Sequence, residues 1–223
     1  MHENANIAFQ TEEINQFINN IMKGQAVGSG DKGGISPDQI VWKLSEEMKR
    51  DIVKQIDVEK MLQSHMQKDS MGRVYSLTTV LVQEINRFNK LLKFMHSSLG
   101  DLQKAIKGFI VMSDDLEDVF RSFLNNQVPK IWTAKAYNSL KSLGSWVHDL
   151  ILRINFVDHW MEFGAPPSSW ISGLFFPQGL LTGTLQAFSR RYGVSINQLM
   201  YDFTPLPFYI SQDDVKIAYG SKN

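Results

Sequence analysis

The 223 residues of the protein include no cysteine, which excludes disulfide bonds, thiolate metal sites and a cysteine nucleophile. There is also no excess of either charge, since Lys plus Arg and Asp plus Glu both number 23. A balanced charge argues against nucleic acid as the main partner, because binding to phosphates depends on a basic excess. No apolar run reaches the roughly 18 residues of a membrane span, and residues 1–6 lack the features of a signal peptide. We therefore expect a cytoplasmic protein with no membrane partner.

The motifs of common catalytic sites are missing as well. The glycine-rich loop at 24–34 includes Lys32, but no Ser or Thr follows this lysine and a predicted helix precedes the loop, so it does not match a phosphate-binding loop. His159 and Glu162 lie about one helical turn apart, but a metal site needs a third ligand. No G-x-S-x-G elbow of a serine hydrolase occurs. We therefore predict no catalytic, cofactor-binding or metal-ligating residue, no cofactor and no enzymatic activity in this segment.

Apolar side chains in a heptad repeat form the clearest pattern in the sequence. Their spacings alternate between four and three residues, and they are Leu81, Ile85, Phe88, Leu92, Met95, Leu99, Leu102, Ile106 and Phe109. The repeat predicts one long spine helix from about Ser76 to Lys107, roughly 45–50 Å in length at about 1.5 Å per residue. Such a stripe is either the seam of a coiled-coil dimer or a spine buried by neighbouring helices. Of eight flanking positions only Glu84 is charged, whereas dimer seams usually carry charged pairs there, so we favour the spine.

The remaining patterns predict a mainly α, multi-helix fold with a short β-containing part at the C-terminal end. Amphipathic spacing, caps and helix breakers predict helices at 11–23, from residue 36 onward, at 57–67, 113–126 and 137–163, around Trp170, and at 177–192. Residues 195–207 are expected to be extended, and residues 214–219 alternate like a strand. Because a lone strand is not stable, we expect this last part to be truncated.

Two of the helix starts carry capping chemistry. Pro37 suits a first helical turn, and Ser36 can cap it. Asp114 and Glu117 have the spacing of a capping box, and acidic residues in a first turn favour the helix dipole. The same acidic cluster lacks the glycine and the alternating oxygen ligands of a calcium loop. We therefore assign it to capping rather than to cation binding.

Two groups of side chains leave alternatives open. A basic set on the long helix, away from the stripe, is either a solvated face or a contact for an acidic partner, and we favour the solvated face. It consists of Arg87, Lys90, Lys93, Lys104 and Lys107. Four tryptophans in a short window form either a packed junction or a binding surface, and we favour the junction. They are Trp132, Trp146, Trp160 and Trp170.

Three segments, taken in order, are similar to parts of one known protein family. The first is His2-Glu3-Asn4-Ala5, which is similar to the stretch that leads out of the sixth AAA module. The second begins with Asp101-Leu-Gln-Lys-Ala-Ile-Lys-Gly108 and continues through Val111-Met-Ser113 and Leu116-Glu117 to Val128-Pro129 and Trp132. The third and most specific is Trp170-Ile-Ser-Gly-Leu-Phe-Phe-Pro-Gln178 with Leu181-Thr-Gly-Thr184. Together the three segments resemble the C-terminal region of dynein heavy chains. The loop at 24–37 is closer to axonemal than to cytoplasmic dyneins.

The resemblance implies three parts: junction helices on the lid side after the sixth AAA module (1–73), the helical core of the dynein C-terminal region (74–194), and the start of an incomplete β-rich part (195–223). It implies a non-catalytic structural and regulatory segment that braces the AAA ring of an ATP-driven, minus-end-directed microtubule motor. The implied partners are the remainder of the motor ring and, through the parent complex, intermediate chains, light chains and microtubules. The implied location is the cytoskeleton, in the axoneme of a cilium or flagellum. The alternative is a free-standing helical adaptor that dimerises through the stripe at 81–109.

A single set of residues carries the spine and the family resemblance, and we assign it a structural role. The set comprises Leu81, Ile85, Phe88, Leu92, Met95, Leu99, Lys104, Gly108, Trp132, Trp170, Gly173, Pro177, Gln178, Thr182 and Gly183.

Overall fold

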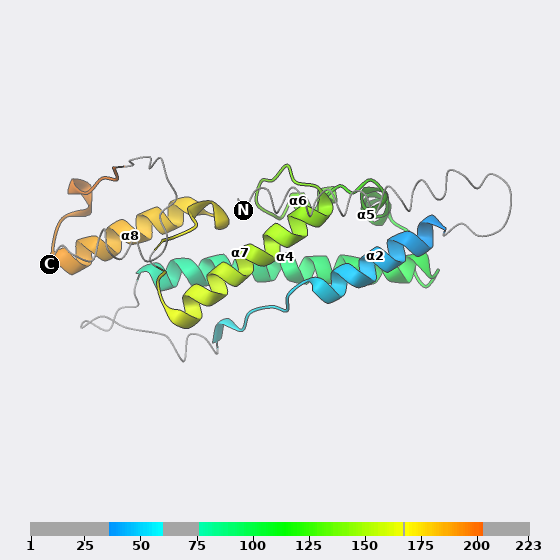
Figure 1. Ribbon diagram of the computed structural model, residues 1–223, viewed down its shortest axis with the longest axis horizontal. Coiled ribbons are helices and arrows are strands. Elements are labelled where there is room, and N and C mark those ends of the chain that lie inside the picture. The colour runs from blue at the N-terminus through cyan, green and yellow to red at the C-terminus, as the bar shows by residue number, and fades with distance from the viewer. Residues whose placement is uncertain (1–35, 60–75, 167, 203–223) are drawn as a thin grey trace, which may run out of the picture. The chain divides into compact units, whose positions relative to one another are not determined.

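The computed structural model of the protein describes residues 36–59, 76–166 and 168–202, and these residues are mainly helical (Figure 1). Within these three ranges no strand occurs. In sequence order the elements are α2 (Pro37–Asp51), α4 (Ser76–Ile106), α5 (Asp114–Leu124), α6 (Lys130–Thr133), α7 (Leu143–Phe163), the 3₁₀ turn η1 (Ile171–Gly173), α8 (Pro177–Tyr192) and the 3₁₀ turn η2 (Ile196–Gln198).

The protein divides into two compact units. Of the described residues, the first unit contains 36–55 and 88–152, and the second contains 56–59, 76–87, 153–166 and 168–202. Both α4 and α7 therefore contribute residues to each unit. The three segments 1–73, 74–194 and 195–223 inferred from the family resemblance remain a prediction.

Helix α4 confirms the predicted spine helix at both ends to within one residue. Its stripe is removed from water along most of its length, and the side chains that are at most 3% exposed are Leu81, Ile85, Phe88, Leu92, Met95, Leu99 and Leu102. The predicted end of the stripe is wrong, since Ile106 is only half-buried and Phe109 is 76% exposed. The helix stops at Ile106, and Gly108 turns the backbone with a φ of 76°. The 3.6-residue period that would carry Phe109 inward is lost at that turn.

Aromatic rings fill the core of the first unit. Trp132 from α6 and Trp146 from α7 stack with ring centroids 6.1 Å apart, and Phe123 from α5 meets Trp132 edge-on at 5.9 Å. The ring of Tyr137 also stacks with Trp146, with ring centroids 6.0 Å apart. Trp132 and Trp146 are at most 1% exposed. This part of the tryptophan window is therefore a packed junction, as favoured from the sequence.

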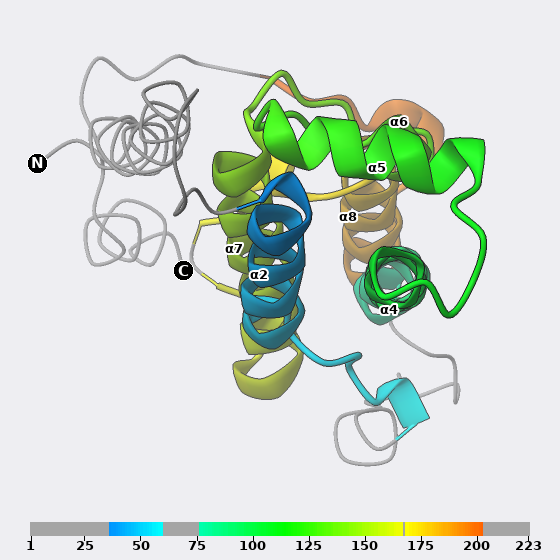
Figure 2. The same cartoon turned by 90° about the vertical axis from the view of Figure 1, so that its right-hand side faces the viewer.

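Helix α2 begins with the predicted cap. The Ser36 hydroxyl accepts from the backbone N–H of Gln39 at 3.2 Å, and the Gln39 side chain accepts from the Ser36 N–H at 3.2 Å, which forms a reciprocal capping box. Further along, the Gln103 amide of α4 donates to the hydroxyl of buried Ser45 at 3.2 Å. In the same unit α5 crosses α2 (Figure 2).

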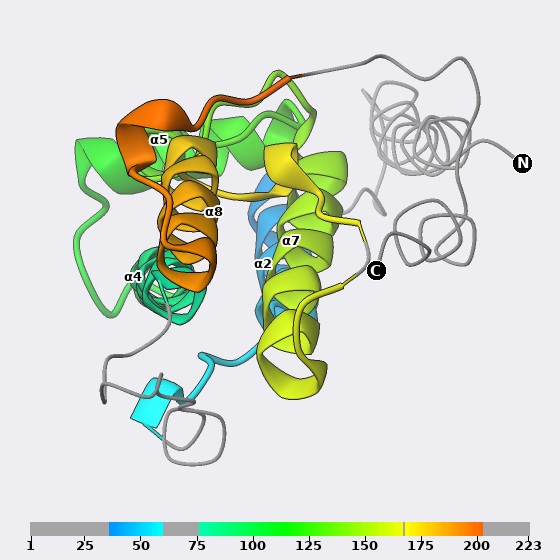
Figure 3. The same ribbon diagram turned by 90° about the vertical axis from the view of Figure 1, so that its left-hand side faces the viewer.

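Helix α8 has the predicted limits, with Pro177 in its first turn and Gly193 directly after its last residue. Only Leu180 and Gly183 of this helix are buried. The turn η2 then lies beside α8 (Figure 3). The prediction of extended backbone from residue 195 is wrong at Ile196–Gln198, because the N–H of Gln198 bonds to the Ser195 carbonyl and closes a turn.

Two further boundaries differ from prediction. Helix α5 is capped by Ser113, whose hydroxyl accepts from the Leu116 N–H, and not by Asp114. Helix α7 starts at Leu143 rather than at residue 137, since the N–H of Leu143 donates to the distant Asn126 carbonyl instead of to a preceding helical turn. The helix at 11–23, the loop at 24–34, the strand at 214–219 and most of the helix at 57–67 lie outside the described residues.

The first prediction concerns the buried stripe. Replacing Leu92 by Asp places an unpaired carboxylate at a position that is 1% exposed, so we expect a loss of unfolding free energy on the order of 4 kcal/mol. Lys93→Asp is the matched control, because Lys93 is exposed on the same helix. Urea denaturation followed by circular dichroism measures both variants, and equal midpoints would contradict a buried spine.

The second prediction concerns the indole of Trp132, whose Nε1 donates to the buried Ser98 hydroxyl at 2.9 Å. Ser98→Ala leaves this buried donor without its acceptor, so we expect a cost of about 1–3 kcal/mol in unfolding free energy. In a Trp132→Phe background the same Ser98→Ala change should cost much less, because the donor is already gone. Equal costs in the two backgrounds, measured by denaturant melts, would show that the hydrogen bond contributes nothing.

Candidate functional site

The segment that carries the most specific sequence pattern, residues 170–183, lies in the second unit and consists of η1 and the first turns of α8. Trp170 is half-buried beside η1, and Pro177 occupies the first turn of α8. Gln178 and Thr182 are exposed, while Gly173 and Gly183 are buried. Ser172 is exposed as well, so the segment presents polar side chains to solvent while Gly173 and Gly183 pack inward.

A buried carboxylate holds this segment in place. Glu84 of α4 is 1% exposed, and its carboxylate accepts from the backbone N–H groups of Phe175 at 2.5 Å and Phe176 at 3.1 Å. The guanidinium of Arg87 donates to the same carboxylate at 2.7 Å. The two N–H groups lie at the start of α8, where intrahelical acceptors are missing and the helix dipole favours negative charge. The carboxylate thus has both charge and hydrogen-bond partners for its burial.

Sequence reasoning missed this role of Glu84. Phe175 and Phe176 follow Glu84 by 91 and 92 residues in the sequence, so no local spacing links them. One signal was present, because Glu84 is the sole charged residue among the eight positions that flank the stripe. A charged side chain beside a buried stripe is destabilising unless it has a hydrogen-bond or ion-pair partner. The Glu84 carboxylate has such partners in the segment at 170–183.

Gly173 and Gly183 lie so close to neighbouring side chains that a Cβ atom would not fit at either position. A Cβ atom added at Gly173 would lie 2.6 Å from the indole of Trp170, so the ring folds directly over the glycine. A Cβ at Gly183 would lie 2.9 Å from Val80 of α4, which shows how closely α8 approaches α4 in this unit. Both positions exclude a side chain for reasons of space. We therefore infer a packing role for Gly173 and Gly183.

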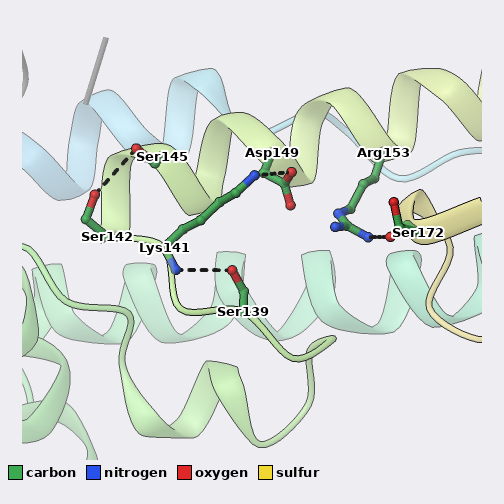
Figure 4. A network of polar contacts seen from close by, with 7 residues as sticks. All are labelled: Ser139, Lys141, Ser142, Ser145, Asp149, Arg153 and Ser172. Atoms are coloured by element: carbon green, nitrogen blue, oxygen red, sulfur yellow. Dashed lines mark hydrogen bonds and ion pairs between the residues drawn. The ribbon is translucent and has the colours of Figure 1, made fainter. Parts of the chain in front are cut away.

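Two arginines bracket the segment. Arg153 of α7 donates to the Ser172 carbonyl (Figure 4), and its guanidinium lies 5.1 Å from the centroid of the Trp170 ring. The guanidinium of Arg87 lies 5.2 Å from the ring of Phe176. Each arginine thus combines a hydrogen bond with a cation–π contact, and both contacts restrain the turn that precedes α8.

Most of the other predicted residues belong to the first unit. Lys104 is exposed and pairs with Asp101 at 3.1 Å, Gly108 ends α4, and Trp132 lies in the aromatic core of the first unit. The structure therefore does not gather the predicted set into one site. The stripe residues Leu81 and Ile85 fall in the second unit, and the stripe residues of the first unit are Phe88, Leu92, Met95 and Leu99.

A polar cluster near the start of α7 is the closest approach to a catalytic arrangement in the first unit. The Lys141 ammonium pairs with Asp149 (Figure 4). Its nitrogen lies 2.5 Å from an Asp149 carboxylate oxygen, and Asp149 is 4% exposed. The Ser139 hydroxyl accepts from the backbone N–H of Lys141 and does not meet its amine. A serine nucleophile needs a base within hydrogen-bond reach. The contacts instead fix the loop that leads into α7.

Two further features are absent from the described part of the protein. No group of three or more His, Asp or Glu side chains there is placed to hold a metal ion. Among the same residues, no helix has both the length and the apolar character needed to cross a membrane.

The Glu84 carboxylate generates a direct prediction. Glu84→Gln replaces one acceptor oxygen with an NH₂ group, so two hydrogen-bond donors face each other at a buried backbone N–H. The substitution also removes the negative charge that pairs with Arg87. We expect a loss of about 2–3 kcal/mol in unfolding free energy. Glu117→Gln is the matched control, since Glu117 also pairs with an arginine but its side chain is 50% exposed. Denaturant melts should show that the control loses no more than about 0.5 kcal/mol of unfolding free energy. An equally small loss for Glu84→Gln would show that the Glu84 carboxylate does not stabilise the segment at 170–183.

Nearly the whole length of this sequence is similar to known proteins. The family profile that describes the C-terminal domain of the dynein heavy chain matches residues 11–219. Dynein axonemal heavy chain 6 of Homo sapiens is 50% identical over 212 residues, which are 95% of this protein and 5% of that relative. Dynein axonemal heavy chain 1 of Mus musculus is 44% identical over 207 residues, which are 93% of this protein and again 5% of the relative.

A third relative, dynein axonemal heavy chain 3 of Mus musculus, is 38% identical over 215 residues, which are 96% of this protein. The sequence thus spans about 5% of the length of these relatives. The resemblance seen in the three sequence segments is confirmed, and the protein belongs to the family of C-terminal domains of dynein heavy chains.

Proposed function

We propose that this protein is a non-catalytic structural and regulatory segment of an axonemal dynein heavy chain, and that it braces the AAA ring of the motor. The observation that carries the proposal is the family match over residues 11–219. The relatives are named axonemal heavy chains, which supports a place in the cytoskeleton and in the axoneme of a cilium or flagellum. The parent motor would be the ATP-driven, minus-end-directed microtubule motor that moves the cilium.

The packing supports a bracing role. The groups that chemistry would need are engaged in structural contacts, as Glu84 is with two backbone N–H groups and Asp149 is with Lys141. A carboxylate fixed by several hydrogen bonds is poorly placed to exchange protons with a substrate. Buried carboxylates held by structural contacts of this kind suit a segment that holds other parts of a motor in position.

The partners follow from the same proposal. The remainder of the motor ring would be the direct partner, and the intermediate chains, the light chains and the microtubule would be reached through the parent complex. We include neither nucleic acid nor membrane among the partners, because Lys plus Arg equals Asp plus Glu at 23 each.

The free-standing adaptor is less well supported. Its dimer would need the stripe at 81–109 as a seam. The seven stripe residues from Leu81 to Leu102 are at most 3% exposed within a single copy of the protein, so a seam there would require the fold to open. Phe109, which the dimer hypothesis places at the end of the seam, lies beyond the end of α4.

The proposal is tested by comparing three proteins: the full heavy chain, the heavy chain without this segment, and this segment alone. We expect no ATP hydrolysis by the segment alone, because its role is structural. The truncated heavy chain should still bind nucleotide but should differ several-fold from the full-length protein in microtubule-stimulated ATPase activity and in gliding velocity.

Two outcomes would contradict the proposal. ATP hydrolysis by the isolated segment would give it a catalytic role. Unchanged ATPase activity and unchanged velocity in the truncated heavy chain would show that the motor does not depend on bracing by this segment.

A further inference from the structure

The connection between α4 and α5 in the first unit exposes four consecutive apolar side chains. We call residues 109–112 the apolar loop. Phe109 is 76% exposed, Ile110 39%, Val111 89% and Met112 38%. Single exposed apolar residues are ordinary, but a contiguous run of large ones is the usual mark of a contact surface.

The apolar loop is held at both of its ends. At the α4 end, the N–H of Phe109 donates to the Lys104 carbonyl at 2.9 Å, and Gly108 takes a φ of 76° that a residue with a side chain would adopt only under strain. At the α5 end, Ser113 caps the helix and its carbonyl accepts from the Glu117 N–H at 2.8 Å. The backbone of the apolar loop is therefore anchored at both ends by the neighbouring helices.

The area of the apolar loop limits what can bind it. Taking about 150–200 Å² for each fully exposed side chain, the exposed fractions amount to roughly 400 Å². A stable complex of separate proteins needs about 800 Å² on each partner. The loop is too small for a second copy of the protein to bind it stably. It is large enough for a contact within one polypeptide, where the tether raises the effective concentration of the partner.

The charges around the apolar loop disfavour a lipid surface. On the α4 side Lys104 is paired with Asp101, and Lys107 lies over the ring of Trp42 at 4.9 Å. On the α5 side Asp114 and Asp115 are both exposed. Binding of a loop to an anionic bilayer depends on free basic residues beside the apolar ones. An acidic edge of this kind would instead repel the membrane.

We propose that the apolar loop docks on an apolar surface formed by another segment of the same heavy chain, outside residues 1–223. This inference rests on the proposed function, and it identifies the face of the first unit that meets the rest of the motor. The relatives are about twenty times longer than this protein, which matches about 5% of their length, so most of the polypeptide that could cover the loop lies outside it. The acidic residues at the start of α5 select a partner with basic residues at the rim of its apolar surface.

The test uses the full heavy chain with a photo-crosslinking amino acid, p-benzoylphenylalanine, in place of Val111. In the control the same amino acid replaces Leu140, which is also fully exposed but stands alone between the half-buried polar residues Ser139 and Lys141. After irradiation, mass spectrometry identifies the crosslinked peptides. We expect peptides that join position 111 to heavy-chain residues outside this segment, with several times the yield found at position 140 and no increase in the mass of the heavy chain.

Any other pattern overturns the inference. Crosslinks to a second heavy chain, to tubulin or to lipid would give the apolar loop a different partner, and a yield no greater than at Leu140 would leave it without one. A second readout is the double variant Phe109→Ser, Val111→Ser in the full heavy chain, with Leu140→Ser as control. We expect faster hydrogen exchange in the crosslinked partner segment for the double variant alone, and unchanged exchange there would also overturn the inference. These outcomes leave the proposed function intact, since that depends on the truncated heavy chain and not on this loop.

Discussion

The removal of the α4 stripe from water is the constraint on which the described structure depends. Each of its seven buried side chains contributes about 2 kcal/mol on burial, and a helix cannot cover its own apolar face. Other elements must therefore pack along α4, and residues of this helix belong to both compact units. In the first unit the aromatic rings of α5, α6 and α7 complete a dry core, and in the second unit Gly183 allows α8 to approach Val80.

Burial of the stripe brings a charge inside with it. Glu84 lies beside the buried residues of α4, and an unpaired carboxylate at that depth would be strongly destabilising. The structure resolves this by directing two backbone N–H groups and one arginine at the carboxylate. A polar requirement of the spine therefore fixes where the segment at 170–183 must run. This coupling joins a helix and a turn that are far apart in the sequence.

The sequence predicted those features whose causes are local. The limits of α4 and α8 and the cap at Ser36 follow from periodicity, from Pro37 and Pro177, and from Gly193, all of which act within a turn or two of the helix ends. The start of α7 could not be predicted in this way, because it depends on a hydrogen bond between Leu143 and Asn126 across 17 residues. The contacts of Glu84 were missed for the same reason. The heptad spacing of apolar residues extends to Phe109, but α4 ends at Ile106. The spacing therefore predicted a helical, buried position for a residue that lies beyond the helix.

The connection at Gly108 also has a mechanical consequence. The apolar loop is joined by backbone hydrogen bonds to a helix of 31 residues, about 45 Å long at about 1.5 Å per residue. A helix of this length behaves as a stiff rod under small loads, since bending it would stretch the hydrogen bonds along one side. A displacement imposed on the loop would therefore move the part of α4 that belongs to the first unit, residues 88–106, as a whole and would not deform the loop alone. Strain at the loop would thus be shared with the aromatic core, which is bonded to this part of α4 through Trp132 and Ser98.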